Sequence, residues 1–181
     1  MSPRTVDLYN TSLAVLSLIA LTGAALLIGY RLVNGKQAAA SLLGGSALWL
    51  AWLVAAVATA GSLVYSEVIH FVPCRLCWFQ RIAMYPLAIV LLVGAIRREA
   101  VARFYALPLA LGGLVISIWH YVIQVYPSLE GGSCDPLNPC SARNVEVFGF
   151  ISIPFMAGAG FIVIAVLLAL YTRQPQEARN E

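Results

Sequence analysis

The chain has 181 residues, of which 61% are hydrophobic and only 10% are charged, and its formal net charge is +3. Soluble domains contain about 45–50% apolar and about 25% charged residues. The composition therefore excludes a disordered chain, a nucleic-acid-binding protein with a basic face and most soluble enzymes. A mean hydropathy of +0.85 indicates a protein of the lipid bilayer.

Five stretches without Lys, Arg, Asp or Glu predict an all-α polytopic membrane protein with five transmembrane helices. They are Leu8–Tyr30, Gln37–Ser66, Ile82–Ile96, Phe104–Leu129 and Val147–Thr172. A bilayer core about 30 Å thick needs about 20 helical residues, and four of the stretches exceed that length. The third has only 15 residues, so we expect it to recruit Cys77–Arg81 and to place Arg81 just inside one membrane face.

The basic residues between these helices predict the orientation of the chain. Seven Lys and Arg residues fall on one side of the membrane and four on the other. The positive-inside rule places the side with seven in the cytoplasm. The N-terminus and both cysteine-bearing loops are then extracytoplasmic, and the C-terminus is cytoplasmic. A cleaved signal peptide in place of the first helix would reverse this bias, and no clear cleavage site follows that helix, so a retained helix is favoured.

All four cysteines lie in two loops on the predicted outer side: Cys74 and Cys77 form a CxxC motif, and Cys134 and Cys140 lie six residues apart. Pairs of cysteines outside the reducing cytosol indicate thiol chemistry. The CxxC motif directly precedes the third helix, whose N-terminus can stabilise a thiolate. Two alternatives remain open: a structural zinc site of four thiolates, although the second spacing fits zinc poorly, and two inert disulfides.

Two ionisable residues, Arg81 and His120, are expected near the outer membrane surface. Ionisable groups inside a membrane usually have a partner or a function. Arg81 continues the i, i+3, i+7 stripe of Cys74 and Cys77, and both residues lie about 10 Å below the outer helix ends. Snorkelling of Arg81 and an interfacial role for His120 are the simpler interpretations. A quinone would fit between them, because a cation stabilises the charge that develops on its carbonyl oxygen during reduction.

The segment Pro73–Ile82, with the sequence PCRLCWFQRI, resembles the CxxC-x3-R signature of the disulfide bond formation protein B (DsbB/BdbC-like) family of membrane thiol:quinone oxidoreductases. The likeness is greatest to Gram-positive-type relatives. The segment from His120 to Ser128 also resembles the end of that family's penultimate helix, and the second cysteine pair and a last helix follow it. The resemblance extends roughly from Gln37 to Tyr171.

This resemblance implies a fold and a location. Residues 37–172 would form a four-helix catalytic bundle in the bacterial inner membrane. Residues 1–36 would add an extra transmembrane helix and linker, for which we expect only peripheral packing. Residues 173–181 would form a polar cytoplasmic tail.

The resemblance also implies a reaction, in which a DsbA-like thioredoxin-fold protein is reoxidised and its electrons pass to ubiquinone or menaquinone. Cys134 and Cys140 would take electrons from this partner, and Cys74 and Cys77 would pass them on, with Cys77 as the charge-transfer thiolate. Arg81 would bind the quinone, with help from His120. Neither a resident metal nor a nucleic-acid partner is expected.

Besides the extra N-terminal helix, two features of the chain differ from the family pattern. Cys134 and Cys140 are closer together than in the best-known members, and Gln80 occupies a position that is acidic in some relatives. A vitamin K epoxide reductase-like enzyme is disfavoured as an alternative, because its CxxC motif follows the shuttle pair instead of preceding it. A non-enzymatic zinc-binding membrane protein is the alternative from a different class.

Overall fold

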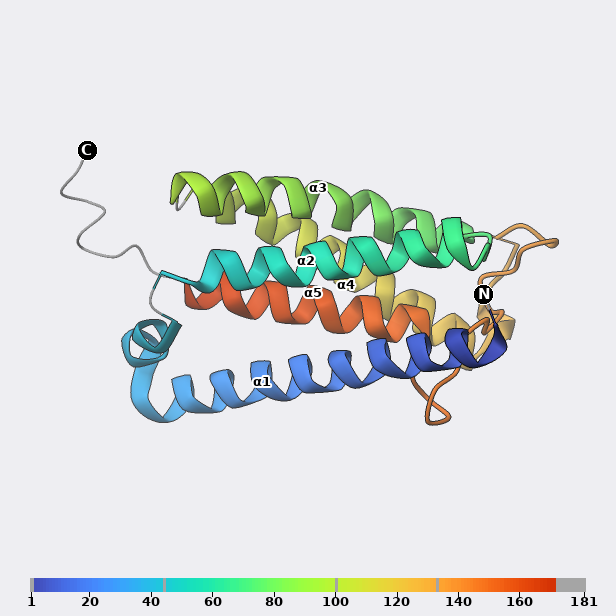
Figure 1. Ribbon diagram of the computed structural model, residues 1–181, viewed down its shortest axis with the longest axis horizontal. Helices are drawn as coiled ribbons and strands as arrows, with labels where there is room; N and C mark the ends of the chain where they lie inside the picture. Colours follow the sequence, from blue (N-terminus) through green and yellow to red (C-terminus); the bar gives the residue numbers. More distant parts are fainter. Residues whose placement is uncertain (1, 44, 100, 133, 172–181) are drawn as a thin grey trace.

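Five long helices run alongside one another in the computed structural model of the chain, which describes residues 2–43, 45–99, 101–132 and 134–171 (Figure 1). The helices are α1 (Pro3–Leu43), α2 (Ala47–Leu63), α3 (Arg75–Arg97), α4 (Ala102–Val125) and α5 (Ile153–Leu170), and a π-helical turn, Val64–Val68, extends α2. Only isolated β-bridges, and no strands, occur in these residues. The predicted all-α fold is confirmed.

All five helices are long and apolar enough to cross a membrane. Helix α3 has 23 residues because it begins at Arg75, so the short third stretch recruits Cys77–Arg81 as expected. Large apolar side chains on the outer faces are exposed, as for Ile19, Ile89 and Val115. Such an apolar surface is stable in contact with lipid. Five apolar helices of this length with this surface are those of a multi-pass membrane protein.

The second transmembrane helix begins later than the uncharged stretch Gln37–Ser66 predicts. Helix α2 starts at Ala47, and the preceding residues form a short helix at the end of α1. Gly35 separates this short helix from the rest of α1 with a φ of 86° and a ψ of 166°. Only glycine adopts this backbone conformation readily. The predicted polar tail, residues 173–181, lies outside the described residues.

Helix α5 is the centre of the bundle. It packs against α1, α2 and α4, and in Figure 1 it lies between α1 and α2, with α4 crossing behind it. Phe161 and Ile164 are fully buried in the main apolar cluster with Leu87 of α3 and Ala106 of α4. The N-terminus and both cysteine-bearing loops lie at one end of this bundle, and α5 ends at the other (Figure 1).

Helices α4 and α5 approach closely where Gly113 faces the ring of Phe161. A Cβ on Gly113 would lie 2.2 Å from Phe161 Cζ, whereas a Cβ on the adjacent Gly112 would have no atom within 4 Å. Gly113 therefore permits the contact between the two helices, as small residues commonly do in membranes.

We expect Gly113→Ala to destabilise the protein by about 1–3 kcal/mol, because the added methyl overpacks the contact with Phe161. Gly112→Ala is the matched control and should leave stability unchanged. The measurement is the thermal unfolding midpoint of each variant in detergent. Equal midpoints for the two variants would show that the helices do not meet at Gly113.

Candidate active site

The CxxC motif forms the N-terminus of α3. Cys74 is the N-cap residue, with an extended backbone, and its Sγ accepts a hydrogen bond from the backbone N–H of Cys77 at 3.4 Å. The two thiols are reduced, and their sulfur atoms lie 3.0 Å apart, within hydrogen-bond distance of each other. The N-terminus of a helix favours negative charge, so the site is arranged to hold a thiolate on Cys74.

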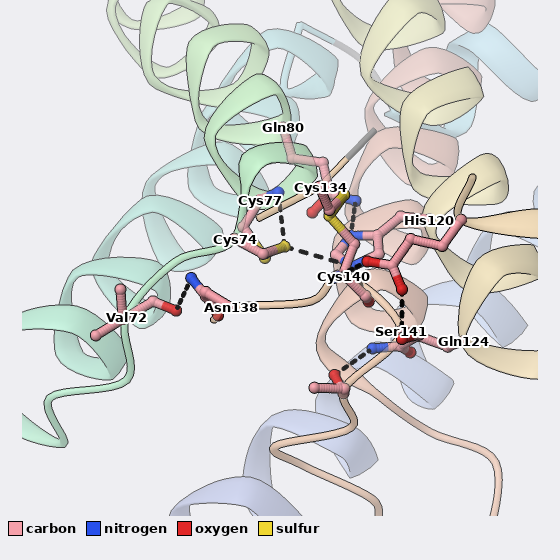
Figure 2. Close-up of a disulfide and its surroundings, with 12 residues drawn as sticks. Val72, Cys74, Cys77, Gln80, His120, Gln124, Cys134, Asn138, Cys140 and Ser141 are labelled. Carbon is pink, nitrogen blue, oxygen red and sulfur yellow. Dashed lines mark hydrogen bonds between the residues drawn. A yellow bond between two sulfur atoms is a disulfide. The ribbon is translucent and has the colours of Figure 1, made fainter. Parts of the chain in front are cut away.

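The second cysteine pair is a disulfide between Cys134 and Cys140, in the connection between α4 and α5. Cys140 is 1% exposed and Cys74 is 6% exposed, and both are drawn in Figure 2. They share a small apolar cluster with Ile123 of α4. Cys77 and the partly exposed Cys134 pack against the same cluster. The short loop therefore already holds the disulfide beside the reduced pair.

His120 of α4 connects the two cysteine pairs. It is 2% exposed, and its Nε2 lies 3.0 Å from the carbonyl oxygen of Cys140 and 3.6 Å from Sγ of Cys74 (Figure 2). Because a carbonyl oxygen can only accept, Nε2 carries a hydrogen. Nδ1 lies 3.4 Å from the amide nitrogen of Gln80, which donates to it. These contacts define a neutral imidazole with its hydrogen on Nε2.

The pKa of Cys74 is lowered to about 4. The largest cause is the hydrogen bond from the Cys77 thiol, and the hydrogen bonds from His120 and from the backbone N–H of Cys77 act in the same direction. Burial opposes them, because it disfavours the charged form. Cys74 is therefore a thiolate at neutral pH, while Cys77 supplies a hydrogen to it.

Arg81 lies on α3 beyond the CxxC motif. Its Nε donates to the hydroxyl of Ser62 at 2.9 Å and its Nη2 to the carbonyl of Ser62 at 2.8 Å, and its guanidinium stacks over Trp78 at 5.4 Å. Tyr85 donates to the same hydroxyl. No carboxylate pairs with Arg81 in the described part of the chain, so neutral groups hold this cation and leave its charge uncompensated.

A cavity of about 350 Å³ lies beside these groups. Its polar lining includes Cys74, Cys77, Gln80, Arg81, His120 and Gln124, together with Ser17, Ser62, Asn138 and Asn144. Most of the remaining wall is apolar and comes from α1, α2, α5 and the loops beside the cysteines. A volume of about 300–1,000 Å³, a mainly apolar wall and a few polar groups are typical of a small-molecule site.

Polar contacts anchor the disulfide loop. The carboxylate of Glu130 accepts from the backbone N–H of Cys140 and from the hydroxyl of Ser141, both at 2.6 Å. On the other side, the amide of Asn138 donates to the carbonyl of Val72 at 3.4 Å, which ties the loop to the segment before the CxxC motif.

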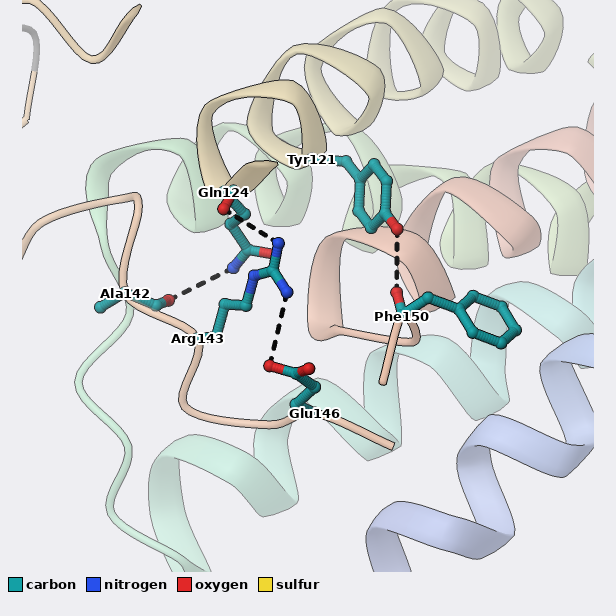
Figure 3. A network of polar contacts seen from close by, with 6 residues as sticks. All are labelled: Tyr121, Gln124, Ala142, Arg143, Glu146 and Phe150. Carbon is teal, nitrogen blue, oxygen red and sulfur yellow. Dashed lines mark hydrogen bonds and ion pairs between the residues drawn. The ribbon is translucent and has the colours of Figure 1, made fainter. Parts of the chain in front are cut away.

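The segment that follows the disulfide is fastened to α4 (Figure 3). Gln124 donates to the carbonyl of Ala142 at 3.2 Å, and Arg143 donates to the carbonyl of Gln124 at 3.0 Å while it pairs with Glu146 at 3.4 Å. Tyr121 donates to the carbonyl of Phe150 at 3.0 Å. These bonds fix the position of the loop on the bundle.

The family described as "Disulfide bond formation protein DsbB" matches residues 44–171 of the chain. The chain belongs to the DsbB family. It is 46% identical over 129 residues to the "Probable disulfide formation protein" of Oceanobacillus iheyensis, and the aligned residues make up 70% of this chain and 89% of that relative. It is 41% identical over 131 residues to "Disulfide bond formation protein C" of Bacillus subtilis, and these residues make up 72% of this chain and 95% of that relative.

Membership of the DsbB family supports an oxidoreductase role in disulfide formation. It rules against a vitamin K epoxide reductase-like protein. No solved structure matches the chain. The four-thiolate zinc site is not formed in this state, because Cys134 and Cys140 are bonded to each other.

The six residues that sequence analysis selected all lie around one site in this family member. His120 and the four cysteines are in or beside one cluster, and Arg81 and His120 line one cavity. Three further residues of the site were not predicted from the sequence: Ser62, which holds Arg81, Glu130, which holds the disulfide loop, and Gln80, which contacts His120. No motif marks these residues, because each acts through a partner at least ten positions away along the chain.

The lowered pKa of Cys74 predicts a thiolate that persists at low pH. We expect the thiolate absorbance of Cys74 to stay constant between about pH 6 and pH 9, whereas an ordinary thiol with a pKa of about 8.5 loses most of it below pH 8. The measurement uses a chain in which Cys77 is replaced by Ser, which keeps a donor, and Cys134 and Cys140 by Ala.

The control is the same chain with Cys77→Ala, which removes the donor. Its titration should move to higher pH, because the thiolate loses the hydrogen bond that lowers its pKa most. A native Cys74 that titrates near pH 8.5 in the Ser background would contradict the assignment.

Proposed function

We propose that this chain is a dithiol:quinone oxidoreductase of the bacterial cell membrane that reoxidises an extracytoplasmic DsbA-like thioredoxin-fold protein. The observation that supports it best is the burial of an oxidised and a reduced cysteine pair in one cluster, next to a cavity with an uncompensated cation. The N-terminus and both cysteine loops face outward in this proposal, and the C-terminus faces the cytoplasm.

Burial decides which sulfur meets the partner. Cys140 is 1% exposed, whereas Cys134 is partly exposed. A partner thiolate therefore attacks Sγ of Cys134, forms a mixed disulfide and releases Cys140 as a thiolate. The second thiol of the partner then attacks the mixed disulfide, so that the partner leaves as a disulfide and Cys134 is released as a thiolate.

The electrons then move to the CxxC motif, which begins this part of the cycle as a disulfide. The Cys140 thiolate attacks Sγ of Cys74, forms a Cys74–Cys140 bond and releases Cys77. Cys134 attacks Cys140, which restores the Cys134–Cys140 disulfide and releases Cys74. The products are an oxidised partner and a reduced CxxC pair, and this is the arrangement of disulfide and thiols in the structure.

His120 supports the exchange at Cys74. Its Nε2–H lies 3.6 Å from the sulfur that is attacked and then released. A hydrogen-bond donor stabilises a departing thiolate and so makes it a better leaving group. Gln80 keeps the hydrogen of His120 on the nitrogen that faces this sulfur.

The cavity residues fit a quinone, because a largely apolar wall meets a cation and a neutral N–H donor at one end. A bound quinone, whether ubiquinone or menaquinone, supplies the acceptor of two electrons and two protons. Arg81 would hold a carbonyl oxygen and stabilise negative charge on it. Cys77 carries one of these protons on its sulfur.

The test compares Arg81→Gln with Arg97→Gln, a matched change at the opposite end of α3. We expect Arg81→Gln to lower kcat/KM for quinone at least about tenfold, because a preorganised positive charge is lost. Arg97→Gln should behave like the unchanged protein. Quinone reduction is followed optically with purified full-length protein and a reduced thioredoxin-fold donor.

Oxidation of the donor can be measured separately from quinone reduction by trapping the mixed disulfide between the donor and this protein. Arg81→Gln should leave the amount of this mixed disulfide unchanged. Unaltered quinone kinetics in Arg81→Gln would overturn the site assignment. One zinc ion per purified chain, released when the cysteines are replaced, would support a zinc-binding protein in place of the proposed enzyme.

A further inference from the structure

Helix α1 contributes to the wall of the cavity, although the family match does not include it. The match begins at residue 44, after the end of α1. The B. subtilis relative aligns over 95% of its own length, so the rest of that relative is too short for a helix of 41 residues. The wall residues that α1 provides are Leu13, Leu16, Ser17 and Ala20.

The polar attachment of α1 lies at the end nearest the cysteines. Tyr9 donates to the carbonyl of Gly61 at 3.1 Å, and Asn10 accepts from the hydroxyl of Tyr65 at 2.9 Å. The rings of Tyr9 and Tyr65 meet edge to face at 5.3 Å. Gly61 permits this approach, because a Cβ there would lie 3.3 Å from the Tyr9 hydroxyl and 3.5 Å from Leu13.

The remainder of α1 is held by small apolar contacts. Ala14 and Ala24 are buried, but only 11% of the most apolar window of α1 is buried inside the protein. One face of α1 thus covers the cavity and the bundle, and the other faces outward. Without α1, this side of the cavity would open directly to lipid.

The surface that α1 presents to the cavity is chemically simple. Three of its four residues are hydrocarbon, and the hydroxyl of Ser17 is already used by the carbonyl of Ala14 at 2.7 Å. Such a wall contacts hydrocarbon and offers no donor to a carbonyl oxygen. The polar end of the cavity, with Arg81 and His120, comes from other helices.

We propose that α1 is a wall of the acceptor site, which separates a bound quinone from the lipid and increases the affinity of the site for it through apolar contact. This inference rests on the proposed function. It assigns to α1 a binding role beyond peripheral packing, and it predicts that changes on one face of α1 alter quinone binding without any change to the cysteines.

The first test fills the cavity from α1. Ala20→Phe adds a ring at the cavity wall, and Ala25→Phe adds the same ring on the exposed face of the same helix. We expect Ala20→Phe to raise the Kd for a short-chain quinone at least about tenfold, and Ala25→Phe to leave it within about twofold. Mixed-disulfide formation with the reduced donor should be equal in both.

The second test loosens the wall without filling the cavity. Asn10→Ala removes the acceptor of Tyr65, and Asn34→Ala is the matched control, because Asn34 is exposed on the same helix and donates to the carbonyl of Tyr30 one turn earlier. Loss of one buried hydrogen bond should raise the Kd for quinone about fivefold in Asn10→Ala. The thermal unfolding midpoint shows whether Ala20→Phe is folded. If it is not, Asn10→Ala alone tests whether α1 contributes to quinone binding.

The outcomes separate the two proposals. If the unchanged protein binds no quinone, the proposed function fails and this inference fails with it. If the unchanged protein binds quinone and both Ala20→Phe and Asn10→Ala bind it equally well, the proposed function survives and α1 is not part of the site.

Discussion

The site depends on one hydrogen atom, that on Nε2 of His120. This N–H faces the carbonyl of Cys140 and the sulfur of Cys74 together, so it joins the disulfide loop to the CxxC motif inside an apolar cluster. A buried polar group without a partner is costly. The loop and α3 must therefore both be in place for His120 to be satisfied, which couples the folding of the loop to the assembly of the thiol site.

Gln80 determines which nitrogen of His120 carries the hydrogen. A carboxylate next to Nδ1 would attract a second hydrogen and favour a charged imidazolium, whereas the amide of Gln80 donates to Nδ1 and keeps the ring neutral. The negative charge of the Cys74 thiolate is then balanced by hydrogen bonds, not by a buried ion pair. The positive charge of the site is that of Arg81, which also lines the cavity.

Much of the fold could be predicted from the sequence, because a long uncharged stretch has few alternatives to a membrane helix. The position of Arg81 relative to the CxxC motif also follows from helical spacing alone. The start of α2 could not be predicted, since the short helix after Gly35 has no charged residue beyond Lys36 and so runs into the same uncharged stretch as the span itself. Nor could the contacts of Ser62 and of α1 with the cavity, because faces toward lipid and toward protein are both apolar in a membrane.

The six-residue spacing of Cys134 and Cys140 changes the problem of electron transfer. A short loop cannot travel far between a partner and the CxxC motif, and Glu130 and Asn138 hold it in place while Cys140 already packs with Cys74. In the proposed reaction, exchange between the pairs then takes place by rotation of side chains within one cluster, without displacement of the loop. The partly exposed Cys134 remains at the edge of that cluster, so in this proposal the approach of the partner, and not the reach of the loop, is the diffusive step.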